Sequence, residues 1–261
     1  VMSEYVAKLA KNYDIGVFLN LDHFKKGDLE LIRAAISEEL VSSIMIDASK
    51  EPFEKNVEIT KKVVEMAGEG NVLIEGELGM IKGVEDEDTA STEALYTDPR
   101  EAVEFVSKTG VDLLAVSIGT QHGVSKGRDI ELRAELAKQI DEALVESGEE
   151  VPLVLHGSSG LMEDQLKEVL NYGICKMNKD TRYQYEYART ALDYYYDHKD
   201  SILPPEDVVD DRDGFFSDSD WSPNKSHFDP RVVSQLIRDR IKEVAGSLFE
   251  QSGSVNRSIY K

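Results

Sequence analysis

The stretch Pro152-Leu153-Val154-Leu155-His156 is a short apolar run of strand-forming residues that stops at a histidine. Two further segments end in the same way, Phe18-Leu19-Asn20-Leu21-Asp22-His23 and Leu114-Ala115-Val116-Ser117-Ile118-Gly119-Thr120-Gln121-His122. The chain has only five histidines. Neutral imidazole is the commonest protein ligand for zinc, and catalytic zinc typically takes three protein ligands. The three histidines at the strand ends therefore predict one zinc site. For any single one of them, a hydrogen bond to a neighbouring carbonyl is an alternative explanation.

Short apolar runs alternate along the chain with longer stretches of helical period, which is typical of βα units around a parallel sheet. The runs that predict strands are residues 17–21, 43–46, 72–77, 113–117, 153–155 and 174–177. An open sheet is compatible with this pattern. However, functional groups at the carboxyl ends of several successive strands favour a (β/α)8 TIM barrel.

A complete barrel has eight strands, whereas the sequence shows six. A helical pattern over residues 1–10 precedes the first run, so we expect the first two βα units to be absent from this sequence. Beyond the sixth run the pattern changes to a tyrosine-rich helix (183–196) and later to a last helix (230–250). The expectation is one N-terminally incomplete barrel domain over 1–261, with a helical C-terminal extension over 183–261.

The formal net charge of −21 argues against nucleic acid or an anionic membrane surface as a partner. An anionic small molecule must then be held by local backbone amides, lysines and arginines against the overall field. The single cysteine, Cys175, cannot form an internal disulfide, and the sequence shows no long apolar stretch. These features predict a cytoplasmic protein in which Cys175 is a small buried thiol.

Acidic residues accompany the same strand ends. Glu75 and Glu77 lie two residues apart in the run 72–77 and hence on one face of the predicted strand. Two carboxylates in a strand are costly to bury unless they meet a cation or hydrogen-bond donors, and a metal ion would satisfy them. Asp47 ends the run 43–46 in a similar position, where a solvated strand end is the alternative explanation.

Small-residue turns follow the last two predicted strands. They are Gly157-Ser158-Ser159-Gly160 and Asn178-Lys179-Asp180-Thr181. Backbone amides in such turns can approach an anion, and the loops after the last two strands of a barrel are its usual phosphate site. Each turn alone is a weak signal, and their joint position makes it stronger. A third loop, Gly123 to Gly127, adds Lys126, which could meet a second phosphate.

The ordered series of motifs resembles the class II, metal-dependent ketose-bisphosphate aldolases over nearly the whole chain. The motifs are Leu21-Asp22-His23, Met45-Ile46-Asp47-Ala48-Ser49, Glu75-Gly76-Glu77-Leu78-Gly79, Gly83-Val84-Glu85-Asp86, Tyr96-Thr97-Asp98-Pro99, Gly119-Thr120-Gln121-His122-Gly123, Leu155-His156-Gly157-Ser158-Ser159-Gly160 and Asp229-Pro230-Arg231. Fructose-1,6-bisphosphate and tagatose-1,6-bisphosphate aldolases share this series. One departure is Ser158, where many members have glycine. It matters only if that position needs a positive φ.

The resemblance implies a zinc ion and, around it, a site that binds a sugar bisphosphate. The implied zinc ligands are His23, His122 and His156, with Glu77 and Asp47 serving an alternate position or a second divalent or monovalent cation. The implied proton-transfer groups are Asp22 at the substrate hydroxyl, which requires a turn at His23, and Glu85 on the ketone fragment. The groups implied around the substrate are Gly123, Gly157, Ser159, Asn178 and Asp180, with Thr181 beside them and Arg231 reaching a phosphate from a neighbouring subunit of a homodimer or larger homo-oligomer.

The expected reaction is reversible cleavage of fructose 1,6-bisphosphate to dihydroxyacetone phosphate and glyceraldehyde 3-phosphate, in glycolysis and gluconeogenesis. The tagatose epimer differs at one hydroxyl and is the nearest alternative. A metal-dependent phosphoesterase, with the histidines activating water, and a non-catalytic module folded around zinc are more distant alternatives.

Overall fold

The computed structural model describes residues 2–83, 96–124 and 127–258, and the chain divides into two compact units. One unit comprises Val1–Lys179 with Gln251–Lys261, and the other comprises Asp180–Glu250. The second unit overlaps the helical extension expected over 183–261, although residues 251–261 belong to the first unit. The description of 1–261 as a single domain stays a prediction.

Six parallel strands form the sheet of the first unit. They are β1 (Asn20–Phe24), β2 (Ser43–Ile46), β3 (Leu73–Leu78), β5 (Leu113–Val116), β7 (Leu153–Leu155) and β8 (Ile174–Met177). Their spatial order is the order of the sequence, with β1 and β8 at the two edges of the described sheet. Right-handed crossovers between neighbouring parallel strands place the helices on one side of a sheet and curl it. The α/β fold with a curled parallel sheet is therefore confirmed, while the absence of two βα units stays a prediction.

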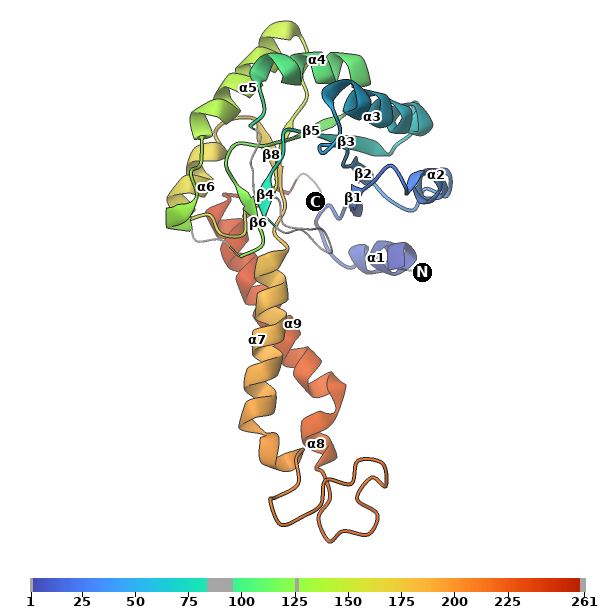
Figure 1. Cartoon of the computed structure of the whole chain (residues 1–261), viewed down its shortest axis with the longest axis vertical. Helices are drawn as coiled ribbons and strands as arrows, with labels where there is room; N and C mark the ends of the chain where they lie inside the picture. Colours follow the sequence, from blue (N-terminus) through green and yellow to red (C-terminus); the bar gives the residue numbers. More distant parts are fainter. Residues whose placement is uncertain (1, 84–95, 125–126, 259–261) are drawn as a thin grey trace. The chain divides into compact units, whose positions relative to one another are not determined.

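The connecting helices lie around the outside of this sheet (Figure 1). They are α2 (Leu29–Ser37), α3 (Phe53–Ala67), α4 (Pro99–Thr109), α5 (Ala134–Ser147) and α6 (Glu163–Val169), with α1 (Met2–Ala10) before β1. A small second sheet pairs β4 (Lys82–Gly83) with β6 (Gln121–His122), and the 3-10 turn η1 (Gly127–Asp129) follows it. None of the helices in the described ranges is long and apolar enough to cross a membrane.

The first predicted strand is the one whose position was wrong. The run 17–21 was expected to be a strand, but pairing begins only where Asn20 meets Ser43 of β2. Val17 and Phe18 lie ahead of the sheet and are exposed. Their apolar character predicted a strand, but both residues precede Asn20, where the register pairs of the sheet begin. The runs 43–46, 153–155 and 174–177, in contrast, coincide with β2, β7 and β8.

Alternation along the strands separates an outer core from an inner face. Ile44 and Ile46 pack in the large cluster beneath the helices, whereas Met45 belongs to a small separate cluster. The register pairs Met45 with Glu75, and Glu77 with Ala115 of that same small cluster. Neighbouring residues at one register position share a face, so both glutamates point to the inner side, as their spacing predicted.

Gly76, between the two glutamates, faces the helices. A Cβ atom there would lie 3.0 Å from Phe105 Cε1, and 3.1 Å from both Thr60 Cγ2 and Val111 Cγ1. Strand β3 therefore approaches the helix layer as closely as a residue without a side chain permits.

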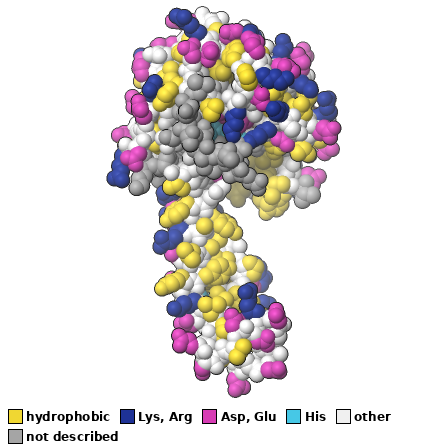
Figure 2. Space-filling model, in the orientation of Figure 1, with side chains coloured by type: hydrophobic (Ala, Val, Ile, Leu, Met, Phe, Trp, Pro, Cys, Tyr) yellow, Lys and Arg dark blue, Asp and Glu magenta, His cyan; other side chains and the backbone are white. Residues whose placement is uncertain are grey.

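The second unit is helical. It contains α7 (Thr181–Asp197), the 3-10 turn η2 (Lys199–Ser201), α8 (Lys225–Phe228) and α9 (Pro230–Gln251). Arg240 on α9 donates to both carboxylate oxygens of Glu186 on α7, at 2.8 and 3.2 Å, and Glu186 is 6% exposed. Hydrophobic side chains gather along these helices and acidic ones at the loop end (Figure 2).

The expectation for Cys175 was wrong. Its side chain is exposed on β8. This strand is an edge of the described sheet, so only one of its neighbours is another strand.

Candidate functional site

The structure brings the three strand-end histidines together. His23 is on β1, His122 ends β6, and His156 directly follows β7. One ring nitrogen from each lies within 4.8 Å of the others. The ring centroids are 4.9 to 6.1 Å apart. This is the arrangement that one shared cation needs.

His23 has an unusual backbone that turns its ring into the cluster. Its φ is 49°, in the left-handed region that residues other than glycine rarely adopt, and the β1–β2 register shifts between Leu21 and Phe24. The structure thus contains the turn expected at His23. Backbone strain of this kind persists only where the surroundings enforce it, and it is concentrated at functional sites.

Glu75 determines which nitrogen of His156 faces the cluster. His156 Nε2 lies 2.8 Å from Glu75 Oε1, while its Nδ1 lies 3.0 Å from His23 Nε2, and both His156 and Glu75 are fully buried. Lys176 on β8 donates to Glu75 Oε2 at 2.6 Å. Burial alone raises the pKa of Glu75, but His156 and Lys176 outweigh it and hold the pKa below its ordinary value. The ionised carboxylate therefore accepts the Nε2 proton.

Asp47 acts on His23 in the same way. Its Oδ2 lies 3.4 Å from His23 Nδ1, and its Oδ1 accepts from the backbone N–H and hydroxyl of Ser49 at 3.0 and 2.7 Å. Burial raises the pKa of Asp47, but the hydrogen bonds from His23 and Ser49 hold it well below the usual range. The Nε2 atom of His23 is thus left to face the cluster.

These two carboxylates make the cluster suitable for a cation. When Nδ1 of His23 and Nε2 of His156 each donate to a carboxylate and the rings are neutral, two unprotonated nitrogens face each other at 3.0 Å. Such nitrogens repel unless a cation or a shared proton lies between them. Two nitrogens on one tetrahedral zinc ion, each at about 2.0–2.1 Å, lie about 3.3 Å apart. The donor set therefore fits the implied metal.

Carboxylates provide two further groups of candidate metal ligands. His23, Asp47 and Glu77 form one, and Asp22, Glu75 and His156 form the other. Glu77 is 3% exposed. Its carbonyl accepts from the buried Asn56 of α3 at 2.8 Å, which ties this part of β3 to the helix layer.

Asp22 lies at the open side of the cluster. Its side chain is 39% exposed, and its Oδ2 is 3.9 Å from His23 Nε2. Asn178, directly after β8, donates to Asp22 Oδ2 at 2.9 Å, and Lys176 Nζ lies 4.0 Å from Oδ1. Asp22 is thus held in place by residues from the opposite edge of the sheet while remaining accessible.

The loops expected to bind phosphate are tied to each other. Ser158 Oγ donates to the carbonyl of Asn178 at 2.6 Å, and Lys179 Nζ donates to the carbonyl of Ser158. Ser158 does not adopt a positive φ, so a serine fits here as well as a glycine. Gly123 and Gly157, in contrast, have φ of 79° and 60°.

Gly157 also allows the loop after β7 to meet β6. A Cβ atom there would lie 2.7 Å from the carbonyl carbon of Gln121, next to His122. We expect Gly157→Ala to lower the free energy of unfolding by about 2–5 kcal/mol, because backbone strain and overpacking combine, and to separate His122 from His156. Urea unfolding measures the first effect and metal affinity the second.

The matched control for Gly157→Ala is Gly148→Ala. Gly148 has a φ of 83° but nothing within 4 Å of its Cβ position, so it carries strain without a clash. A loss in the Gly157 variant no larger than in the control would contradict the packing argument.

Several predicted residues lie outside this cluster. Asp180, Thr181 and Arg231 belong to the second unit, and Glu85 and Lys126 lie outside the described residues. Arg231 is 86% exposed, and its Nε donates to Asp229 Oδ1 at 2.9 Å. Side-chain and backbone hydrogen bonds from Arg231 hold the pKa of Asp229 below its usual range.

Sequence reasoning did not assign Lys176, nor the contact between Glu75 and His156. A signal for Lys176 was present: a lysine inside the apolar run Ile174-Cys175-Lys176-Met177 needs an anionic partner if it faces the interior.

Comparison with known proteins identifies the family. Residues 1–257 match the family model of fructose-bisphosphate aldolase class II. The chain belongs to the class II fructose-bisphosphate aldolase family. This class II aldolase is 34% identical over 248 residues to fructose-bisphosphate aldolase of Staphylococcus epidermidis, covering 95% of the chain and 74% of that relative.

Solved structures of class II aldolases share the fold. Fructose-bisphosphate aldolase of Campylobacter jejuni superimposes with a TM-score of 0.76 at 25% identity, covering 98% of the chain and 75% of that protein. A putative fructose-1,6-bisphosphate aldolase of Coccidioides immitis gives a TM-score of 0.75 at 22% identity, with 98% and 78% covered, and supports the fold alone. The enzyme is an aldehyde lyase, so neither the phosphoesterase nor the non-catalytic zinc module describes its family.

Proposed function

We propose that this class II aldolase reversibly cleaves fructose 1,6-bisphosphate to dihydroxyacetone phosphate and glyceraldehyde 3-phosphate, with zinc as its cofactor. The observation that carries the proposal is the pair of ring nitrogens of His23 and His156, which two carboxylates turn toward one point. The role extends to glycolysis and gluconeogenesis in the cytoplasm. The six strands correspond to six of the eight in a (β/α)8 barrel.

His23 Nε2, His156 Nδ1 and His122 would hold the metal, and Glu77 with Asp47 would serve an alternate position or a second cation. When bound, the ion acts as a Lewis acid that stabilises negative charge on the substrate's carbonyl oxygen. Glu75 and Asp47 orient the two rings for that role.

Asp22 is the acid/base at the substrate's C4 hydroxyl. Cleavage between C3 and C4 converts that hydroxyl to an aldehyde, so its proton has to leave, and an accessible carboxylate can take it. Asn178 and Lys176 keep Asp22 at the edge of the cluster. Glu85 exchanges the proton at C3 of the ketone fragment.

The loops after β7 and β8 bind the phosphate of the ketone half. Gly157, Ser159 and Asn178 come from these loops, which the hydrogen bonds of Ser158 hold together. The other groups proposed around the substrate are Gly123, Lys126, Asp180 and Thr181. A positive φ at Gly123 and Gly157 allows backbone amides to approach an anion closely.

The enzyme functions as a homodimer or larger homo-oligomer in which Arg231 binds substrate phosphate in a neighbouring subunit. Exposed apolar side chains on the helices of the second unit support an association surface: Tyr185, Tyr187, Leu192, Tyr196, Val232, Leu236 and Phe249. The ion pair with Asp229 keeps the guanidinium anchored at the start of α9.

We expect Arg231→Ala to raise the Michaelis constant for the bisphosphate about 10- to 100-fold, because a charge-assisted contact is lost. Mixing this variant with a His156→Ala variant should restore some activity through hybrid sites. Steady-state kinetics of each variant and of the mixture provide the test. An unchanged Michaelis constant, or a mixture no more active than its components, would count against a shared site.

The overall proposal is tested by measuring triose phosphate release from fructose 1,6-bisphosphate and from tagatose 1,6-bisphosphate. We expect the fructose substrate to be preferred. Preference for the other epimer would assign the tagatose alternative, and cleavage of neither would refute the proposal. Removal of metal by a chelator should abolish activity while circular dichroism shows the fold retained.

A further inference from the structure

One of the three groups of candidate metal ligands is in contact with a lysine. Asp22, Glu75 and His156 each offer one ligand atom, and these atoms lie within 4.8 Å of one another. Glu75 and His156 are fully buried, and the side chain of Asp22 is 39% exposed. Carboxylates and imidazoles are ligands that zinc and manganese ions accept in proteins. By its ligand types alone, this group is suited to a divalent cation separate from the one expected among the three histidines.

Lys176 brings a positive charge to this group. Its Nζ atom donates to Glu75 Oε2 at 2.6 Å and lies 4.0 Å from Asp22 Oδ1. Lys176 is on β8, whereas Asp22 is on β1 and Glu75 is on β3. One ammonium group therefore forms ion pairs with carboxylates from two other strands. A charged group inside an apolar run is costly to bury without a partner of opposite charge, and these two carboxylates provide that partner.

A divalent cation and this ammonium group would compete for the same carboxylates. Bonds from zinc to carboxylate oxygen are about 2.0–2.2 Å long, so an ion bound to Glu75 and Asp22 would lie close to Lys176 Nζ. Two cations at such a distance repel each other, and the repulsion is strong where little water screens it. Glu75 is fully buried, so screening at its carboxylate is weak.

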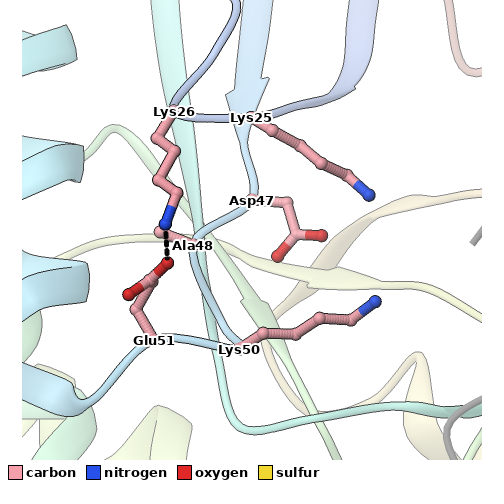
Figure 3. Close-up of a pocket in the computed structure, with 6 residues that line it drawn as sticks. All are labelled: Lys25, Lys26, Asp47, Ala48, Lys50 and Glu51. Atoms are coloured by element: carbon pink, nitrogen blue, oxygen red, sulfur yellow. Dashed lines mark hydrogen bonds and ion pairs between the residues drawn. The ribbon is translucent and has the colours of Figure 1, made fainter.

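The group of His23, Asp47 and Glu77 has a different setting. Asp47 lines a cavity of about 130 Å³ formed by the loops after β1 and β2 (Figure 3). The other residues that line it are Lys25, Lys26, Ala48, Lys50 and Glu51. A small ion can approach Asp47 through this space. A second cation at this group would therefore be counted in the parent protein as well as in any Lys176 variant.

We propose that Lys176 keeps divalent cations out of the group formed by Asp22, Glu75 and His156, so that Asp22 stays available to react with the substrate. The part concerning Asp22 rests on the proposed function, in which this residue is the acid/base. A metal ion competes with a proton for the same ligand atom, so a metal-bound Asp22 would be a poor proton acceptor. The ammonium group supplies positive charge while its distance of 4.0 Å leaves the Asp22 carboxylate accessible.

The test counts the metal ions bound by Lys176→Ala. The parent and the variant are loaded with Zn²⁺ and then titrated with Mn²⁺, which prefers carboxylate oxygen and displaces zinc poorly from histidine. Electron paramagnetic resonance of the free Mn²⁺ gives the number bound. We expect Lys176→Ala to bind one more Mn²⁺ per subunit than the parent. Lys176→Arg keeps the positive charge, so it should bind the same number as the parent.

Two further variants locate the additional ion. Lys176→Ala/Asp22→Asn should lose it, because one of the two carboxylates is gone. Lys167→Ala is the matched control, since this exposed lysine pairs with Glu163 on α6, and its count should equal that of the parent. An unchanged count in Lys176→Ala, or an additional ion that persists in the double variant, would overturn the proposal.

Thermal unfolding identifies a folding defect in Lys176→Ala. In that case Lys176→Gln replaces it, because its amide keeps a donor for Glu75 without the charge, and the same additional ion is expected. The count needs no aldolase activity, so it still tests the exclusion of cations if the parent cleaves no ketose bisphosphate and the proposed function fails. In an active parent, saturating Mn²⁺ should lower kcat of Lys176→Ala by about 10-fold or more and leave kcat of the parent within about twofold. Equal responses of the two proteins would refute the role assigned to Lys176 in keeping Asp22 available.

Discussion

Asp22→Ala is expected to lower kcat for bisphosphate cleavage by about 10²–10⁴, the usual contribution of a general acid/base. The carboxylate stands 3.9 Å from His23 Nε2 and is 39% exposed, so it can reach a substrate bound at the cluster. The loss should appear in kcat and kcat/KM together, since the interaction acts in the transition state. Steady-state kinetics with excess metal measure it.

The metal content of the Asp22 variant provides the control. Asp22 is not a member of the group formed by the three histidines, so metal bound per subunit should match the parent. A variant that loses its metal would make Asp22 a ligand, and a variant with parental activity would remove it from the mechanism.

Glu75→Ala is expected to weaken metal binding about 10- to 100-fold, the usual effect of removing the carboxylate behind a ligating histidine. Without Glu75, His156 Nε2 loses the carboxylate 2.8 Å away, and Lys176 loses the carboxylate that it contacts at 2.6 Å. Because Glu75 is fully buried, the variant should also be less stable, by about 3–5 kcal/mol for a broken buried ion pair. Competition with a chelator and urea unfolding measure the two effects.

A double variant separates the effect of Glu75 on the orientation of the His156 ring from its effect on the free energy of unfolding. Glu75→Gln/Lys176→Met removes both charges, so it should regain much of the stability while metal binding stays weak. Nitrogen NMR of the metal-free protein should show the Nε2-protonated tautomer of His156 in the parent. In the variants it should show the Nε2 and Nδ1 tautomers in exchange. A parental tautomer in Glu75→Ala would show that other contacts of the ring, such as Asn178 at 3.3 Å, orient it rather than Glu75.

The strands were predictable wherever an apolar run also had neighbours to pair with. The run 153–155 became β7 because both of its neighbours in the sheet are strands. Val17 and Phe18 have the same apolar character, but the sheet begins after them. The apolar pattern of a segment indicates whether its side chains prefer to be buried. It does not indicate whether another strand lies next to the segment and pairs with it.

The gathering of the three histidines was predictable for a related reason. In a parallel sheet every strand ends at the same edge, so position at a strand end already implies proximity. The contacts that orient the candidate ligands were harder to predict from the sequence. His156 and Glu75 are 81 residues apart, and Lys176 and Glu75 are 101 apart, so their pairing depends on the register of β3, β5, β7 and β8 together.

Arg231 illustrates the opposite case. Its contact with Asp229, two residues away, is local and follows from the sequence alone. Its proposed contact with substrate phosphate in another subunit depends on how subunits assemble, and the sequence of one chain does not specify that assembly.

Packing around Gly76 couples the helix layer to the position of the two glutamates on either side of it. The strand is pressed against Phe105, Thr60 and Val111 at the one position between two acidic side chains that point the other way. A side chain added at position 76 would displace strand β3 away from the helices, and Glu75 and Glu77 would both move with it. Replacing Phe105 with a smaller residue in the same variant should reduce this displacement. Side chains that face away from the histidine cluster thus determine where these two carboxylates lie.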